Sequence, residues 1–147
     1  WHHKPSNWQG GPSLEEWERH GINFIPMVWG AGANHLDRAV EDGLPREKRA
    51  LLGFNEPNFP EQANLSPQKA ASLWPLVEEL ARNASINYIV SPAVNFAAYD
   101  PIQWLQEFFG NCTGCKAQTC AHCMKTWMFE IARAISSNLQ HMEANLI

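Results

Sequence analysis

Apolar, β-branched runs alternate with amphipathic helical patterns along most of the chain, and this alternation limits the possible folds most strongly. Strands are expected at three runs that each end beside a proline or glycine: 22–30, 50–54 and 87–94. Helices are expected at 13–20, 35–42, 67–83 and 102–109. Strand, helix and strand in units of roughly 30 residues form βαβ units with parallel strands. The sequence therefore predicts an α/β fold. A full (β/α)8 barrel needs about 250 residues, and this chain has 147.

Two helix starts carry clear signals, and one helix contains a breaker. Ser13 is a good N-cap with carboxylates in the following turn, and Ser66 precedes Pro67 at the first helical position. Pro75 lies inside the pattern of residues 67–83. Proline removes a helical hydrogen bond, so we expect Pro75 to kink this helix or divide it in two.

The central apolar run ends in Asn55-Glu56-Pro57, which places a carboxyl group at the C-terminal end of a strand. In parallel α/β folds, that edge carries catalytic acids and bases. An amide beside a carboxyl group suits glycosidases, where the amide holds a sugar hydroxyl next to the general acid. Glu56 is thus the candidate catalytic residue. The simpler alternative is a Glu-Pro turn with a solvated carboxylate.

Four further residues are candidates for substrate binding: Asn55, Asn58, Trp29 and Trp8. Asn55 is expected to hold a sugar hydroxyl, and Asn58 to contact substrate or to shape the loop. Trp8 and Trp29 are expected to stack on pyranose faces, because an aromatic ring buries a large apolar area at low entropic cost. Ordinary turn chemistry for the asparagines and core packing for the tryptophans are the alternatives.

Composition excludes several classes of partner. The formal charge is −4 and no basic patch is present, which argues against nucleic acid as a partner. The longest apolar stretches are only a few residues long, so no membrane span is expected. No cofactor or metal is expected. The first residue is Trp1 rather than methionine, and we expect a mature form or a fragment.

Cysteines and glycosylation sequons favour an oxidising, secreted context. All four cysteines lie in one short stretch, at positions Cys112, Cys115, Cys120 and Cys123. Structural zinc sites usually have a dozen or more residues between their cysteine pairs, so local disulfides are preferred to zinc. Three Asn-x-Ser/Thr sequons, at Asn64, Asn83 and Asn111, are glycosylation candidates.

The character of the chain changes from Lys116 onward. Residues 126–146 form one amphipathic helical pattern, and no strand signal follows. We expect this helix to pack on the domain, to cover an open sheet edge, or to mediate self-association through that edge.

Several motifs, in order, resemble glycoside hydrolase family 128. The matching pieces are Ser6-Asn7-Trp8, Phe24–Gly30, Leu51–Asn58, Ser66–Pro75, Val90–Val94 and Trp104–Cys115. The resemblance implies a secreted TIM-barrel hydrolase acting on β-1,3-glucan at the cell wall. It also implies a retaining mechanism with two glutamates, in which Glu56 matches the general acid/base.

The resemblance stops near Cys115, before the strand that carries the family's nucleophilic glutamate. Glu107 and Glu130 lie in helical patterns and are not assigned to that role. We therefore expect a partial hydrolase domain at residues 1–115, roughly the N-terminal half of a barrel, followed by a non-family segment at residues 116–147. Such a chain is expected to be catalytically incomplete. The alternatives are a non-catalytic β-glucan-binding module and a small cysteine-rich metal or interaction protein.

Overall fold

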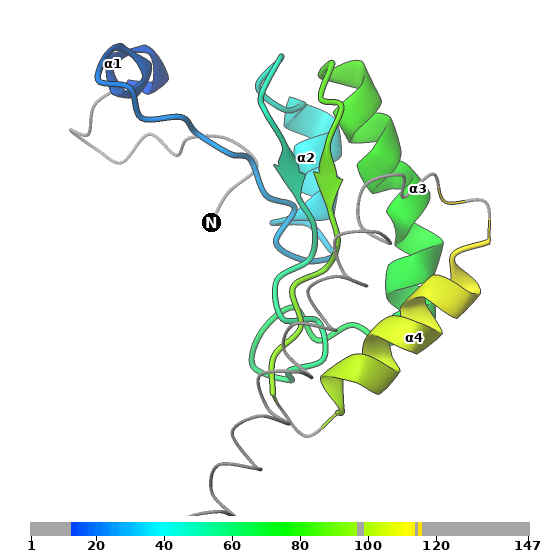
Figure 1. The fold of residues 1–147 in the computed structure, drawn as a ribbon. Coiled ribbons are helices and arrows are strands. Elements are labelled where there is room, and N and C mark those ends of the chain that lie inside the picture. The colour runs from blue at the N-terminus through cyan, green and yellow to red at the C-terminus, as the bar shows by residue number, and fades with distance from the viewer. Residues whose placement is uncertain (1–12, 97–98, 114, 116–147) are drawn as a thin grey trace, which may run out of the picture. The chain divides into compact units, whose positions relative to one another are not determined.

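The computed structural model describes residues 13–96, 99–113 and 115. The chain divides between Lys116 and Ala117, and all described residues belong to the first unit. Within that unit, a small parallel sheet is accompanied by helices, as Figure 1 shows. The α/β class predicted from the sequence is confirmed. No helix in the described part of the chain is long and apolar enough to cross a membrane.

The sheet consists of strands β1 (Leu51–Leu52) and β2 (Ile89–Val90), which pair in parallel with Leu51 opposite Ile89. The segment around Met27 joins the other side of β1 through a parallel bridge between Met27 and Leu52. The Val28 amide donates to the Leu52 carbonyl at 3.0 Å, and the Leu52 amide donates to the Pro26 carbonyl at 2.9 Å. The three expected strands are therefore parallel neighbours, with β1 in the centre.

The regular strands are much shorter than the sequence predicts. Residues 22–30 form only a bridge, and the third run contributes two strand residues. Pro26 and Pro92 lie within these runs and have no amide hydrogen to donate, so the ladder is interrupted at both. Beyond the interruption, pairing resumes at a second parallel bridge, between Asn55 and Ala93.

The helices follow the sequence signals closely. They are α1 (Leu14–Arg19), α2 (Leu36–Asp42), α3 (Pro67–Asn83) and α4 (Pro101–Asn111). The Ser13 and Ser66 side chains accept from the amides of Glu16 and Lys69, as expected of N-caps. Asp100 caps α4 in the same way, accepting from the Gln103 amide.

Pro75 does not divide α3, contrary to one of the two outcomes expected from the sequence. The helix runs unbroken over 17 residues. Trp74 and Val77, on either side of Pro75 along the chain, are both buried. Packing of this face against the sheet and α4 holds both halves of α3 in one helix, although Pro75 cannot donate to the Ala71 carbonyl.

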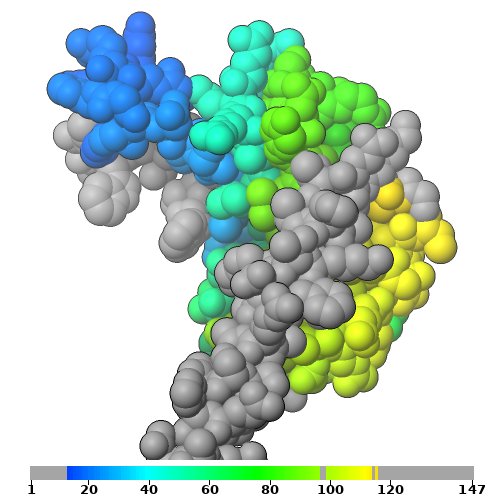
Figure 2. Space-filling view, viewed as in Figure 1, coloured from blue at the N-terminus to red at the C-terminus, as the bar shows by residue number. Residues whose placement is uncertain are grey.

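An aromatic cluster joins α3, α4 and the sheet. The Trp74 ring lies 5.8 Å from that of Phe54 and 5.3 Å from that of Phe108, both in edge-to-face geometry. Helix α4, yellow-green to yellow, forms one side of the surface in Figure 2. Gly53 permits this packing, since a Cβ there would lie 2.8 Å from Trp74 Cη2. The core thus fixes the strand that leads directly to Glu56.

Candidate functional site at the sheet edge

The C-terminal ends of the three parallel segments meet at one edge. The Asn55 amide donates to the Trp29 carbonyl at 2.9 Å, and the Glu56 amide donates to the Ala93 carbonyl at 2.7 Å. Trp29, Asn55 and Glu56 therefore lie at the same edge, as the parallel order predicts. Ser91, which follows β2 directly and precedes Pro92, is buried.

Glu56 has the most unusual backbone at this edge. Its φ is +43°, in the left-handed region. This region is costly for residues other than glycine, and a following proline restricts the backbone further. The side chain is half-buried, and no hydrogen bond or ion pair joins its carboxylate to another residue in the described ranges. Strained backbones of this kind cluster at functional sites, where the surrounding structure holds them in place.

Trp29 and His35 form the aromatic part of the edge. Their ring centroids are 4.6 Å apart, with planes inclined at 36°. Trp29 is half-buried, so part of its ring remains open to a ligand. The sequence did not single out His35, although it follows Trp29 across a short loop that contains two glycines. This loop packs closely on the loop that follows Glu56, because a Cβ on Gly30 would lie 3.3 Å from the Ala63 Cβ.

The two asparagines beside Glu56 have different surroundings. The Asn55 side chain is half-buried and donates to Gln62 Oε1 at 3.0 Å, so one amide hydrogen serves the loop after Glu56. Gln62 was not among the residues selected from the sequence. Asn58 is buried, with only 6% of its surface exposed. Its Nδ2 donates to the carbonyls of Asn95 and Tyr99 at 2.6 and 2.9 Å, and its Oδ1 accepts from the Asn95 amide at 3.0 Å. These bonds favour the loop-shaping role for Asn58.

Glu107 does not lie in the set of residues that meet at this edge. It belongs to α4, and its carboxylate accepts hydrogen bonds from Gln103 and Gln68. This agrees with leaving it out of the nucleophile role. Glu130 and the candidate stacking residue Trp8 lie outside the described residues.

The cysteines and sequons are partly described. Cys112 and Cys115 form a disulfide, with Cα atoms 5.3 Å apart. The zinc alternative needed all four thiolates, and this bond occupies two of them. Cys120 and Cys123 lie outside the described residues. The three sequon asparagines, Asn64, Asn83 and Asn111, are all exposed.

A family model described as the glycosyl hydrolase catalytic core matches residues 1–145. The matched range extends beyond residue 115, where the motif resemblance ends. No curated protein matches the chain.

Several solved structures are similar to the chain, among them the following three. An endo-β-1,3-glucanase of glycoside hydrolase family 128, subgroup II, from Sorangium cellulosum is 38% identical with a TM-score of 0.68, over 82% of this chain and 48% of that one. A subgroup I endo-β-1,3-glucanase from Amycolatopsis mediterranei, in complex with laminaritriose, is 28% identical with a TM-score of 0.53, over 82% and 44%. A subgroup III curdlan-specific exo-β-1,3-glucanase from Blastomyces gilchristii, in complex with glucose, is 30% identical with a TM-score of 0.53, over 82% and 48%. The chain spans about half the length of these structures.

Proposed function

The chain belongs to the glycosyl hydrolase catalytic core family, and from this we propose that it binds β-1,3-glucan at the Glu56 edge. Its sheet is part of a (β/α) barrel, and Glu56 is the general acid/base of a retaining glucan hydrolase. Trp29 stacks on a glucose ring, and Asn55 holds a hydroxyl group next to Glu56. The similar solved structures, several of them complexes with laminari-oligosaccharides, support this class of substrate.

The strongest support is the backbone at Glu56. A half-buried carboxylate in the left-handed region, before a proline and without a partner in the described ranges, contributes little to stability. A general acid needs such freedom, because it must approach the glycosidic oxygen and exchange its proton there. The same edge also carries Trp29, whose carbonyl accepts from the amide of Asn55, the residue before Glu56.

We further propose that the chain by itself turns over glucan negligibly. Retaining hydrolysis needs a second carboxyl group about 5–5.5 Å from the first. Glu107 of α4 accepts hydrogen bonds from Gln103 of the same helix and from Gln68 of α3, and it does not supply this group. A general acid alone contributes only about 10²–10⁴-fold to the rate. The chain therefore acts as a binding unit that carries half of the catalytic pair.

The test measures binding and hydrolysis separately. Laminaritriose binding by calorimetry should weaken about 3–10-fold in Trp29→Ala, while Trp17→Ala, at an exposed tryptophan of α1, should bind normally. Reducing-end release from laminarin should stay at background for the chain, for Glu56→Gln and for the exposed Glu61→Gln. Release that disappears only in Glu56→Gln would show a complete catalytic pair. Absence of binding would overturn the glucan assignment.

We also infer that the protein is a secreted glycoprotein. The Cys112–Cys115 disulfide suits an oxidising compartment, and the three sequon asparagines are exposed to a glycosyltransferase. Expression in a eukaryotic secreting host should yield protein whose mass falls on treatment with an N-glycosidase. Secreted protein with an unchanged mass would contradict the glycosylation part.

A further inference from the structure

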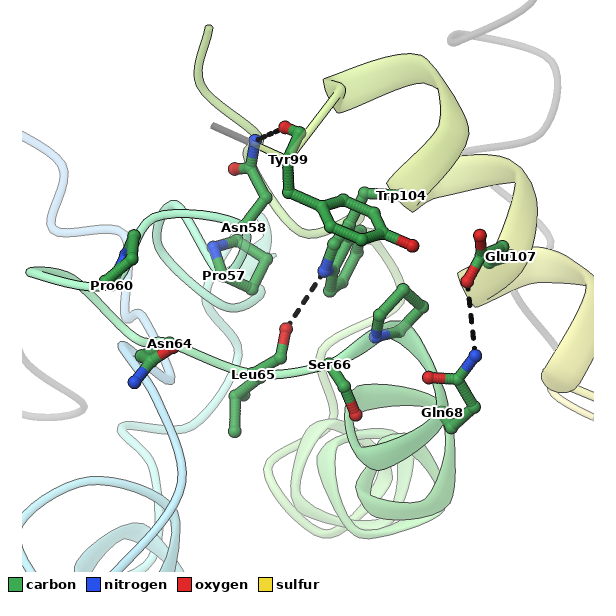
Figure 3. Close-up of a pocket in the computed structure, with 11 residues that line it drawn as sticks. Pro57, Asn58, Pro60, Asn64, Leu65, Ser66, Gln68, Tyr99, Trp104 and Glu107 are labelled. Carbon is green, nitrogen blue, oxygen red and sulfur yellow. Dashed lines mark hydrogen bonds between the residues drawn. The ribbon is translucent and has the colours of Figure 1, made fainter. Parts of the chain in front are cut away.

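A hollow, the rim pocket, lies between the N-terminal ends of α3 and α4 and the loop that follows Glu56. Its volume is about 560 Å³, within the range of small-molecule sites. Figure 3 shows the pocket between the Pro57–Ser66 loop, the start of α3 and the first turns of α4. Its lining residues do not include Glu56, Asn55 or Trp29. The rim pocket is therefore distinct from the Glu56 edge, although it lies on the same loop.

The walls of the rim pocket are mainly flat apolar rings. They come from Pro57, Pro60, Pro67, Tyr99 and Trp104. Trp104 is almost fully buried, and its indole Nε1 donates to the Leu65 carbonyl at 2.9 Å. Trp104 therefore supports the wall from within, as do the buried Pro57 and Pro67, whereas Pro60 is exposed. Tyr99 is half-buried, so its ring is partly accessible from the pocket.

One carboxylate, that of Glu107, is fixed at the side of the pocket. Gln103 Nε2 donates to its Oε1 at 2.9 Å, and Gln68 Nε2 donates to its Oε2 at 3.2 Å. The Tyr99 hydroxyl also donates to it, and in Figure 3 this hydroxyl points toward Glu107. The hydrogen bond from Gln103, followed by that from Tyr99, lowers the pKa of Glu107 below its ordinary value. The pocket thus has an ionised, oriented acceptor.

The lining excludes two classes of ligand. Among the described residues, no lysine, arginine or histidine lines the pocket, so these residues give an anionic group no compensation for the charge of Glu107. A wholly apolar ligand would remove water from the Glu107 carboxylate and return no hydrogen bond. A neutral ring with apolar faces and hydroxyl groups around its perimeter satisfies both conditions. Its face packs on Tyr99 and Pro60, which are the accessible rings of the lining, and its hydroxyls donate to Glu107.

We propose that the rim pocket binds a neutral pyranose, as a carbohydrate site separate from the Glu56 edge. The natural source is β-1,3-glucan, and this choice of sugar rests on the proposed function. A second source exists within the chain, because Asn64 lines the pocket and belongs to a sequon. A glycan on Asn64 carries the same ring chemistry to the same place.

The two tyrosines of the chain give a direct test. Tyr99 lines the pocket, whereas Tyr88 is 56% exposed and does not. Full-length protein is made in a host without N-glycosylation and labelled with 3-fluorotyrosine, so its ¹⁹F spectrum has one signal from each. Titration with laminaritriose should shift the Tyr99 signal and leave the Tyr88 signal in place. Tyr99→Phe and Tyr88→Phe assign the two signals.

Variants separate this site from the Glu56 edge. The Tyr99 shift should persist in Trp29→Ala, and Glu107→Gln should weaken the binding that causes it by about tenfold. Binding seen by calorimetry without a Tyr99 shift would overturn the rim-pocket proposal and leave the proposed function standing. If the Tyr99 shift saturates equally in wild type and Trp29→Ala, and calorimetry detects no binding beyond it, the rim-pocket proposal would stand. Binding at the Glu56 edge would then be overturned. No binding at all would overturn both.

A final comparison distinguishes the two sources of sugar. Protein from a glycosylating host is compared with its Asn64→Asp variant, which removes the sequon. Aspartate is chosen because residue 64 has a φ of +48°, which asparagine and aspartate tolerate best, and because Ser66 is needed to cap α3. If the Asn64 glycan fills the pocket, its removal should restore the Tyr99 response to laminaritriose. A response of equal size in both proteins would assign the pocket to free glucan alone.

Discussion

Glu56 and Glu107 are two half-buried glutamates of one chain, and the structure treats them in opposite ways. Glu107 lies on regular helical backbone in α4 and accepts hydrogen bonds from Gln103, Gln68 and Tyr99. Glu56 lies on left-handed backbone before a proline, and its carboxylate has no partner in the described ranges. Local interactions favour the glutamate at position 107. At position 56 the left-handed backbone opposes it, and the catalytic role proposed for Glu56 would account for its presence there.

Asn58 connects the two regions. It follows Glu56 by two residues, and its side chain binds the backbone of Tyr99, which contacts Glu107. The loop after Glu56 is thereby tied to the segment that leads into α4. Asn58 therefore holds in place both the Glu56 edge and the rim pocket. Substitutions at Asn58 and around it test how far the two sites are independent.

The largest effect is expected from Asn58→Ala. It leaves the Asn95 amide and the carbonyls of Asn95 and Tyr99 without this partner, next to a buried position. We expect a loss of about 2–3 kcal/mol in the free energy of unfolding, measured by urea denaturation. The exposed Asn87→Ala should change it by less than about 0.5 kcal/mol. Equal, small losses in both variants would mean that Asn58 does not hold the loops together.

Gly53→Ala is the next largest. Its methyl group would lie 2.8 Å from both Trp74 Cη2 and the Val90 carbonyl oxygen, and the backbone oxygen cannot move freely. We expect a loss of about 1–3 kcal/mol in the free energy of unfolding. The Glu56 edge should be disturbed more than the rim pocket. Gly110→Ala is the matched control, because a Cβ there meets nothing within 4 Å and alanine favours the helix. It should stabilise the protein by up to about 1 kcal/mol. Two changes of the same sign would contradict the packing argument.

Glu56→Asn directly tests the strain. Asparagine tolerates left-handed backbone better than glutamate, so the variant should be more stable by a few tenths of a kcal/mol up to about 1 kcal/mol. Glu47→Asn is the control, since Glu47 also has positive φ, at +57°, but lies away from the edge. Both should raise the thermal midpoint, and only Glu56→Asn should alter laminaritriose binding. A destabilised Glu56→Asn beside a stabilised Glu47→Asn would show that Glu56 makes stabilising contacts.

The sequence predicted the bounds of the helices well. For the strands it predicted the parallel order but not the lengths. Helix ends depend on local signals such as Ser13, Ser66 and Asp100, which act within one turn. Strand length depends on partners across the sheet, and Pro26 and Pro92 remove donors that a reading of apolar runs does not count. The parallel order was still correct, because the spacing of the runs leaves room for a helix between them.

The candidate site was predictable where one rule sufficed. Parallel strands end at the same edge, so Trp29, Asn55 and Glu56 had to meet there. The role of Asn58 was not predictable, because its partners lie 37 and 41 residues away in a loop without regular structure. The same holds for the rim pocket, where Gln68 and Glu107 are 39 residues apart and meet only through the packing of α3 on α4.

The smallest effect is a pH dependence that belongs to Glu107. The hydrogen bond from Gln103, then that from Tyr99, lowers its folded-state pKa below the ordinary value of 4.5. The unfolded chain therefore binds more protons as the pH falls below 4.5, so this contribution to stability is present above that pH and is lost as the pH falls through the folded pKa.

Gln103→Ala should raise the pKa of Glu107 in a ¹³C carboxyl titration, whereas Gln106→Ala, on the exposed side of α4, should not. In turn, Glu107→Gln should bring the raised pKa of Tyr99, caused first by its bond to Glu107, back toward 10.0. If Gln103→Ala left the pKa of Glu107 unchanged, the contrast between a hydrogen-bonded carboxylate in α4 and an unpartnered one among the described residues of the sheet edge would not hold.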